Sequence, residues 1–164
     1  MLLRPTTAAG EPLGASTARF TIAPEHWPLP VGATLVEAVW HNEIALRSYS
    51  LSPPAVQPGD TLALSLFWEA GQPVSENYVV FVHVLDETGQ LKAQNDDLPR
   101  AGAYPTPWWQ PGTVVEDTHR VVLPANLPGG TYQLVVGLYR PEDGVRLPLK
   151  EGGDSFTVGT VEIQ

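Results

Sequence analysis

Apolar and polar residues alternate with a period of two along the segment Thr61–Glu69. Every second residue there is large and apolar, namely Leu62, Leu64, Leu66 and Trp68. Successive side chains of a β-strand point to opposite faces, so this alternation predicts a strand with one buried and one solvated face, as in antiparallel sheets. Trp68 ends the run, and we expect it to fill the core between two sheets.

Further segments with the apolar pattern of β-strands recur along the chain at a regular spacing. Further strands are predicted at Leu35–Trp40, Ala45–Leu51, Tyr78–Leu85, Leu91–Asn95, Thr113–Leu123 with its charged residues outward, Thr131–Tyr139, Val145–Leu149 and Phe156–Ile163. Turn-forming segments such as Gln57–Asp60 and Pro141–Gly144 separate them. No window has the apolar spacing of an amphipathic helix. The sequence therefore predicts an all-β fold, a two-sheet antiparallel immunoglobulin-like β-sandwich of about eight or nine strands, with a closed barrel as the weaker option.

Tyr132 supports the sandwich more than the barrel. It follows the turn Leu127–Gly130 and enters the apolar run that ends at Tyr139. Immunoglobulin-like domains often have a tyrosine at this point, near the start of strand F, whose hydroxyl bonds back to the preceding corner. An ordinary core tyrosine with a solvated hydroxyl is the alternative.

Composition narrows the class of protein. The 164 residues fit one domain, for which we expect a linker or tail over residues 1–30, leaning on the fold near Phe20, Ile22 and Trp27, and a β-sandwich over 31–164. The net charge is −9, and the nine basic residues are scattered. This charge disfavours nucleic acid and anionic lipid as partners. There is no cysteine and no apolar run of the ~18 residues that a membrane span needs, so we expect no direct membrane insertion.

A set of short motifs resembles a known kind of module. The motifs are Pro58-Gly59-Asp60-x-Leu62, Val80–Asp86 with Gly89, Ala93-Gln94-x-Asp96 with Pro99, Gly102-x-Tyr104-Pro105-Thr106, Trp109-x-Pro111-Gly112, Asp117, Leu123-Pro124, Leu127-Pro128-x-Gly130-x-Tyr132, Val136–Tyr139 and Gly144-x-Arg146-Leu147-Pro148. Over residues 33–164 the chain resembles an uncharacterised β-sandwich module at the C-terminus of bacterial polytopic membrane proteins. Those proteins are similar to dolichyl-phosphate-mannose mannosyltransferase-like glycosyltransferases.

The resemblance implies a location and a kind of role. The module would be extracytoplasmic, in the periplasm or at the cell surface, and attached to a parent membrane domain as its partner. It would have no catalytic residue and no cofactor, because the membrane part of such enzymes carries out the chemistry.

The long segment Gln94–Gly112 is the strongest candidate for a binding surface. It joins two predicted strands, is too long for a hairpin turn, and carries Tyr104, Trp108 and Trp109 with four prolines. Asn95, Asp96 and Arg100 lie nearby in sequence. Flat aromatic faces beside planar polar groups are suited to sugars, so these residues are candidate glycan ligands. The alternative is that Tyr104 and Trp109 are buried plugs. We expect Trp109 to point inward as a structural residue and Trp108 to point outward, on the same rim as Asn95 and Arg100.

Other chemistry has weaker support in the sequence. Asp86, Asp96, Asp97 and Asp117 would suit calcium if they converged, but no spacing matches a known calcium loop, and capping of turns is the alternative. The histidines His26, His41, His83 and His119 have no metal-ligand spacing, so we expect no metal site. A glycosidase would need two acids across a cleft, which sequence cannot place.

These observations favour a non-catalytic accessory domain of a glycosyltransferase-like membrane protein that orients a glycan or packs on its parent. The alternatives are a free-standing carbohydrate-binding module and a structural protein-interaction domain without a small ligand.

Overall fold

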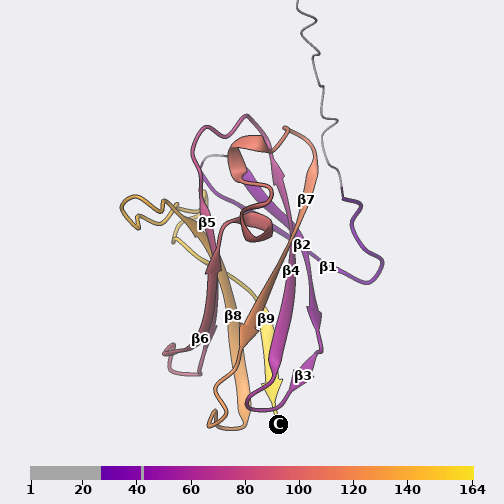
Figure 1. The fold of residues 1–164 in the computed structure, drawn as a ribbon, viewed down its shortest axis with the longest axis vertical. Helices are drawn as coiled ribbons and strands as arrows, with labels where there is room; N and C mark the ends of the chain where they lie inside the picture. Colours follow the sequence, from indigo (N-terminus) through magenta and orange to yellow (C-terminus); the bar gives the residue numbers. More distant parts are fainter. Residues whose placement is uncertain (1–26, 42) are drawn as a thin grey trace, which may run out of the picture.

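The computed structural model describes residues 27–41 and 43–164. Nine strands and two 3-10 turns follow one another along this part of the chain (Figure 1). The strands are β1 Thr34–Val39, β2 Ile44–Ser52, β3 Ala55–Val56, β4 Thr61–Ala70, β5 Val79–Leu85, β6 Leu91–Asp97, β7 Val114–Val122, β8 Gly130–Tyr139 and β9 Phe156–Ile163. The turns are η1 Pro99–Gly102 and η2 Thr106–Trp108. Among the described residues no helix is long and apolar enough to cross a membrane.

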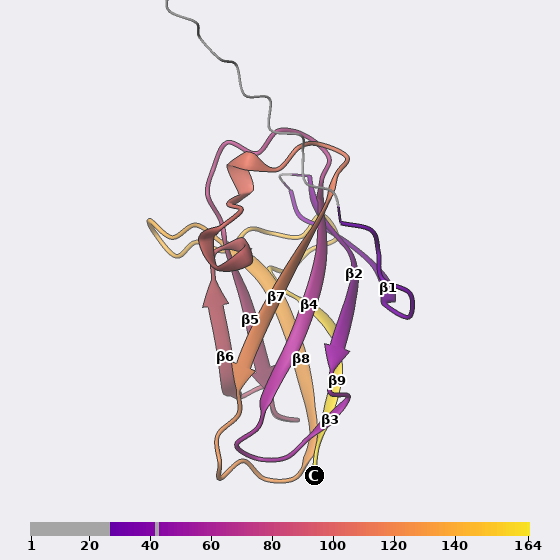
Figure 2. The same cartoon turned by 45° about the vertical axis from the view of Figure 1, so that its right-hand side comes forward.

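The strands form two sheets packed face to face (Figure 2). One sheet has the order β1-β2-β4-β7, and the other has the order β3-β9-β8-β5-β6. The connections β4–β5, β6–β7 and β7–β8 each cross from one sheet to the other. The predicted all-β sandwich is confirmed, with one addition: β3, which the alternation did not reveal, pairs in parallel with β9. It follows Pro53 and Pro54, which end β2, since proline cannot donate to the strand ladder.

The predicted strand Val145–Leu149 is wrong. Its backbone makes only isolated bridges, from Arg146 to Tyr139 and from Leu149 to Trp40. The reason is that its hydrogen bonds join it to different neighbours: Leu147 N–H donates to the carbonyl oxygen of Leu138 in β8, whereas the Pro148 carbonyl oxygen accepts from the N–H of His41, two residues after β1. A segment that passes from one sheet to the other in this way cannot form a continuous ladder with either.

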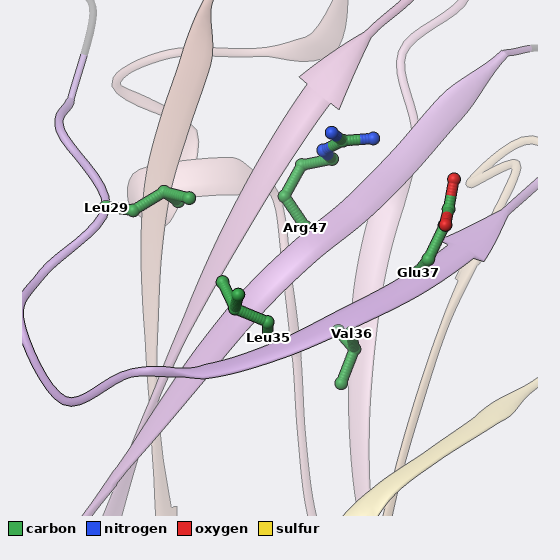
Figure 3. Close-up of a pocket in the computed structure, with 5 residues that line it drawn as sticks. All are labelled: Leu29, Leu35, Val36, Glu37 and Arg47. Carbon is green, nitrogen blue, oxygen red and sulfur yellow. The ribbon is translucent and has the colours of Figure 1, made fainter.

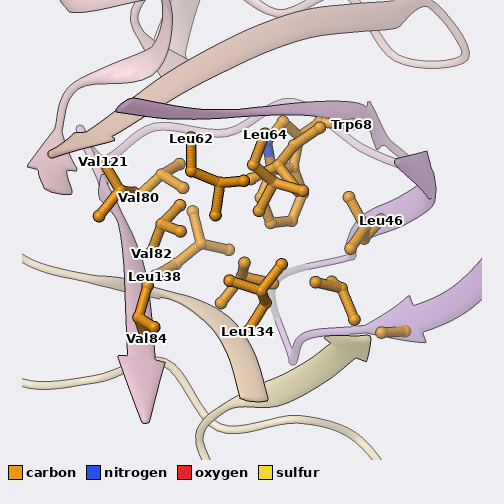
Figure 4. Packing of buried hydrophobic residues seen from close by; sticks show 14 of the residues in the cluster. Leu46, Leu62, Leu64, Trp68, Val80, Val82, Val84, Val121, Leu134 and Leu138 are labelled. Carbon is orange, nitrogen blue, oxygen red and sulfur yellow. The ribbon is translucent and has the colours of Figure 1, made fainter. Parts of the chain in front are cut away.

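The core lies between the sheets, and β4 provides one of its faces (Figure 4). The four large apolar residues of the β4 alternation are fully buried, as predicted: Leu62, Leu64, Leu66 and Trp68. Opposite them lie the inward residues of β5 and β8, which include Val80, Val82, Val84, Leu134 and Leu138. Burying a large apolar side chain contributes about 1.5–3 kcal/mol, so the burial of this face contributes strongly to stability.

The Tyr132 hydroxyl closes a corner at the start of β8. It donates a 2.8 Å hydrogen bond to the carbonyl oxygen of Pro128, and the Tyr132 side chain is buried. This is the geometry that the sequence predicted. The corner lies near the C-terminus, at the opposite end of the sandwich from η1 and η2 (Figure 1).

The first described residue, Trp27, already belongs to the folded unit. Its backbone N–H donates to the carbonyl oxygen of Val114 at the start of β7, and its half-buried ring packs against the core. The rest of the expected contact between tail and fold, at Phe20 and Ile22, lies outside the described residues.

Candidate functional site

The connection from β6 to β7 folds over one end of the sandwich and contains both 3-10 turns (Figure 1). Pro99 begins η1, and Pro107 lies inside η2. Because proline fixes its own φ angle, a loop rich in proline loses less entropy on ordering than a loop of glycine and serine. The local sequence therefore favours an ordered cap.

Contacts of Thr106, in η2, and of Trp109, directly after it, hold this part of the loop in place. The buried hydroxyl of Thr106 donates to the carbonyl oxygen of Glu76 (2.6 Å) and accepts from the N–H of Tyr78 (3.1 Å). The indole N–H of Trp109 donates to the carbonyl oxygen of Tyr104 (2.9 Å), and its ring lies 6.5 Å from that of Trp68. Only 2% of Trp109 is exposed, so it closes the end of the core, as predicted.

Trp108 has the opposite environment and belongs to a cluster of aromatic rings. It is 60% exposed, and the half-buried Tyr104 contacts it edge-on at 6.5 Å. Tyr104 in turn contacts Trp27 at 5.7 Å, and the guanidinium of Arg100 lies 4.5 Å from the centre of the Trp27 ring. We call Trp27, Arg100, Tyr104 and Trp108 the aromatic platform. Such a surface offers an apolar ring face for stacking and polar groups at its margin.

Asn95 and Asp96 do not share one surface with the platform, although they are close to it in sequence. They lie on opposite faces of β6, since Asn95 pairs with Val82 and Asp96 pairs with Phe81. The Asn95 Oδ1 atom lies 2.7 Å from His119 Nδ1, between the sheets. Asp96 lies on the outer face, where its Oδ1 is 3.3 Å from His83 Nε2. Of the five predicted glycan ligands, the structure brings together Arg100, Tyr104 and Trp108.

The platform residue that the sequence analysis missed as a ligand is Trp27. It lies in the stretch assigned to the tail, 73 positions before Arg100 in the numbering. The only signal was its aromatic character in a segment expected to lean on the fold.

In β7 the expectation that charged residues face outward holds for the exposed Arg120 but is wrong for Asp117, which lies on the inward face together with His119. Asp117 and His119 are 1% and 2% exposed. They pair with Leu66 and Leu64 of β4, whose side chains face the core, so they share the inward face of β7. His119 Nε2 lies 2.7 Å from Asp117 Oδ2, and the backbone N–H of Arg100 donates to Asp117 Oδ1 (2.8 Å). The polar groups at this edge are hydrogen-bonded to one another, and buried polar groups without such partners would destabilise the fold.

A further cluster covers the outer face of the five-stranded sheet. The guanidinium of Arg146 lies 4.4 Å from the centre of the Phe81 ring and forms a 3.3 Å ion pair with Asp154. Beside them, burial lowers the pKa of His83, although the Asp96 carboxylate opposes this shift. Burial also raises the pKa of Tyr139, and Asp96 adds to that shift. This cluster fixes the segment that follows β8 onto the sheet.

The four acids considered for calcium, Asp86, Asp96, Asp97 and Asp117, each contact different partners. Asp86 accepts the Thr88 hydroxyl (2.7 Å) and the Gln90 N–H (2.9 Å), and these bonds hold its pKa below the usual range. Asp97 accepts the N–H of the next residue, Leu98. Within residues 27–41 and 43–164, no group of three or more acids and histidines is placed to hold a metal ion.

An open hollow of about 520 Å³ lies beside β1 and β2 (Figure 3). It is lined by Leu29, Leu35, Val36, Glu37 and Arg47. Arg47 and Glu37 extend from the neighbouring strands β2 and β1, and Arg47 Nε also lies 3.6 Å from Glu69 Oε2. None of the predicted site residues lines this hollow.

No protein-family model matches the chain, and no curated protein matches its sequence.

Proposed function

We propose that this protein is a non-catalytic, extracytoplasmic accessory domain of a glycosyltransferase-like membrane protein, and that it binds a glycan on the aromatic platform. The observation that carries the binding role is the exposed Trp108 on an otherwise well-anchored loop. Exposed tryptophan gains about 1.5–3 kcal/mol when an apolar surface covers it. The apolar face of a sugar ring provides such a surface.

The charge around the platform favours an uncharged glycan. The Arg100 guanidinium is already engaged, since it lies over Trp27 and donates to the carbonyl oxygen of Glu116 (3.0 Å). The chain carries a net charge of −9, which repels polyanionic sugars over the distance of the Debye length. We therefore assign neutral oligosaccharides as the ligand class.

A binding role fits the platform better than catalysis. The nearest acid–base pair, Asp117 and His119, is buried inside the sandwich, where it bonds to the protein itself. Substrate bound over Trp108 would not reach these groups, and general acid–base catalysis requires that reach. The accessory role and the membrane-bound parent rest on the resemblance of residues 33–164 to modules of that kind.

Glycan arrays and titrations test the binding role. The wild-type chain should retain neutral oligosaccharides, and Trp108→Ala should weaken their binding at least about tenfold, which corresponds to 1.4 kcal/mol. Val122→Ala is the matched control, because Val122 is an exposed apolar residue in β7. It should bind as wild type does. Retention of no glycan, or equal binding by Trp108→Ala, would overturn the proposal.

The accessory role has its own test. The gene sequence upstream of Met1 should encode membrane-spanning helices in the same reading frame. A gene without such helices, together with glycan binding, would identify a free-standing carbohydrate-binding module.

A specific observation favours a second candidate, a protein-interaction domain. Leu29, Val31 and Leu35 are exposed on and just before β1, an edge strand next to the open hollow. Exposed edge strands and apolar patches are common docking surfaces for other chains. If pull-down with the parent membrane domain depends on Leu35 and no glycan binds, this candidate replaces the first.

A further inference from the structure

A chain of three polar side chains, of which Asp117 and His119 are buried and Asn95 is half-buried, joins the edges of the two sheets and contacts the backbone of the platform residue Arg100. Asn95 in β6 contacts His119, which contacts Asp117, and both of these lie in β7. The separations are 2.7 Å in each case. β6 and β7 are the edge strands of different sheets, so this chain fixes their relative position.

The backbone next to this chain is strained. Arg100 and Ala101 in η1 have φ angles of 55° and 54°, in the left-handed region. A Cβ atom collides with the following carbonyl group there, so residues other than glycine adopt this conformation only where other contacts hold them.

Two consecutive residues of β7 hold Arg100. Its backbone N–H donates to the Asp117 carboxylate (2.8 Å), and its guanidinium donates to the Glu116 carbonyl oxygen (3.0 Å). These contacts place the Arg100 guanidinium over the Trp27 ring. A charge-assisted hydrogen bond that a buried carboxylate accepts is strong and directional.

We propose that Asp117 is the positioning residue of the aromatic platform: by accepting the Arg100 N–H it holds the left-handed turn that places Arg100 on Trp27. His119 and Asn95 keep the Asp117 carboxylate in the orientation that this bond requires. The effect on binding rests on the proposed glycan function, whereas the effect on the shape of the turn does not.

Nuclear magnetic resonance of the full chain tests the bond itself. In the wild-type protein we expect a scalar coupling across the hydrogen bond, between the Arg100 amide nitrogen and the Asp117 carboxylate carbon. Absence of this coupling in a spectrum that shows it for backbone bonds of β4 and β7 would overturn the proposal. This measurement needs no variant and no ligand.

Three variants then test positioning against general stability. Asp117→Ala removes the acceptor, so the Arg100 amide and Trp27 indole signals should shift. Asp117→Asn keeps an oxygen that can accept the N–H, and it should restore both signals toward wild type. Tyr132→Phe is the matched control: it removes a buried hydrogen bond at the other end of the sandwich and should leave both signals in place.

Relief of the strain provides an independent check. Glycine adopts the left-handed conformation without steric cost, and Ala101 is exposed. Ala101→Gly should therefore restore part of the Trp27 indole signal when combined with Asp117→Ala. If Asp117→Ala shifts neither signal, or if Tyr132→Phe shifts them equally, Asp117 is not a positioning residue.

The outcome for binding separates this inference from the proposed function. For any neutral oligosaccharide that the wild type retains, Asp117→Ala should lower the affinity at least about tenfold. Asp117→Asn and Tyr132→Phe should keep it. If the wild type retains no glycan but the signals respond as described, the glycan proposal fails and the positioning role of Asp117 stands.

Discussion

Trp108 and Trp109 are neighbours in the chain but lie in opposite environments, with 60% of Trp108 and 2% of Trp109 exposed. The turn η2 ends between them, and Trp109 continues in an extended conformation. The backbone changes from the turn to an extended conformation at this point, so the two successive side chains leave it in different directions. One residue therefore closes the core while the other faces solvent.

Substitution of the two tryptophans should separate stability from binding. Trp109→Ala removes a buried ring and the bond from its indole to Tyr104, so it should lower the free energy of unfolding by about 3–5 kcal/mol. Trp108→Ala should lower it by less than about 1 kcal/mol, as for most surface positions. Denaturant unfolding of both variants beside wild type measures this. A larger loss of unfolding free energy in Trp108→Ala than in Trp109→Ala would mean that Trp108, and not Trp109, points into the core.

The Tyr132 corner predicts a loss of stability without a loss of fold. Tyr132→Phe leaves the Pro128 carbonyl without its hydrogen-bond donor, which should lower the free energy of unfolding by about 1–3 kcal/mol. Tyr104→Phe is the control, because it keeps the ring that contacts Trp27 and the carbonyl that accepts from Trp109. An unchanged denaturation midpoint in Tyr132→Phe would show that the hydroxyl bonds to water in solution.

Local sequence was sufficient to predict most of the strands and the buried face of β4. Leu62 and Trp68 could be placed inward because a period of two leaves one face of a strand apolar, and Tyr132 could be placed because its turn precedes an apolar run. β3 was missed because two residues carry no period. The segment Val145–Leu149 was mistaken for a strand because apolar character does not show which neighbours will receive its hydrogen bonds.

The site was harder to predict because its contacts are distant in sequence. Asp117 was expected to face outward, since charge normally avoids the core, and the sequence did not decide whether His119 lies in the core or at the surface. Their partners, Arg100 and Asn95, come from a loop and from another sheet, and no local pattern reports such pairing. Trp27 was also missed as a platform residue because it lies far from Arg100 in sequence, before β1.

Gly137 should not tolerate a side chain. A Cβ atom there would lie 2.3 Å from Phe81 Cζ and 2.9 Å from the Asp154 carbonyl oxygen. Gly137→Ala should therefore lower the free energy of unfolding by about 1–3 kcal/mol, as overpacking does. At Gly159 a new Cβ atom would lie 2.6 Å from the Tyr49 hydroxyl, which is the end of a single side chain. Gly159→Ala should therefore lower the free energy of unfolding by less than Gly137→Ala does. Thermal unfolding of both variants compares them, and equal losses would contradict this explanation.

His83 should make the stability depend on pH near neutrality. Burial lowers its pKa below the ordinary value of 6.5, and nearby Arg146 adds to that shift, whereas Asp96 opposes it. The unfolded chain therefore takes up a proton near pH 6.5 that the folded chain does not take up until a lower pH. The contribution of His83 to stability is complete above about pH 6.5 and is lost as the pH falls toward the folded pKa.

A comparison with His83→Gln isolates this effect from the other titrating groups. Between about pH 7.5 and 5.5 the wild type should lose more free energy of unfolding than His83→Gln does, because glutamine takes up no proton in either state. In Asp96→Asn the carboxylate that opposes the shift is absent, so the pKa of His83 should fall further and the loss should be at least as large as in wild type. Denaturant unfolding at a series of pH values measures all three proteins. If the wild type and His83→Gln curves fall in parallel, His83 is as easily protonated in the folded state as in the unfolded chain, and the outer-face cluster does not hold it neutral.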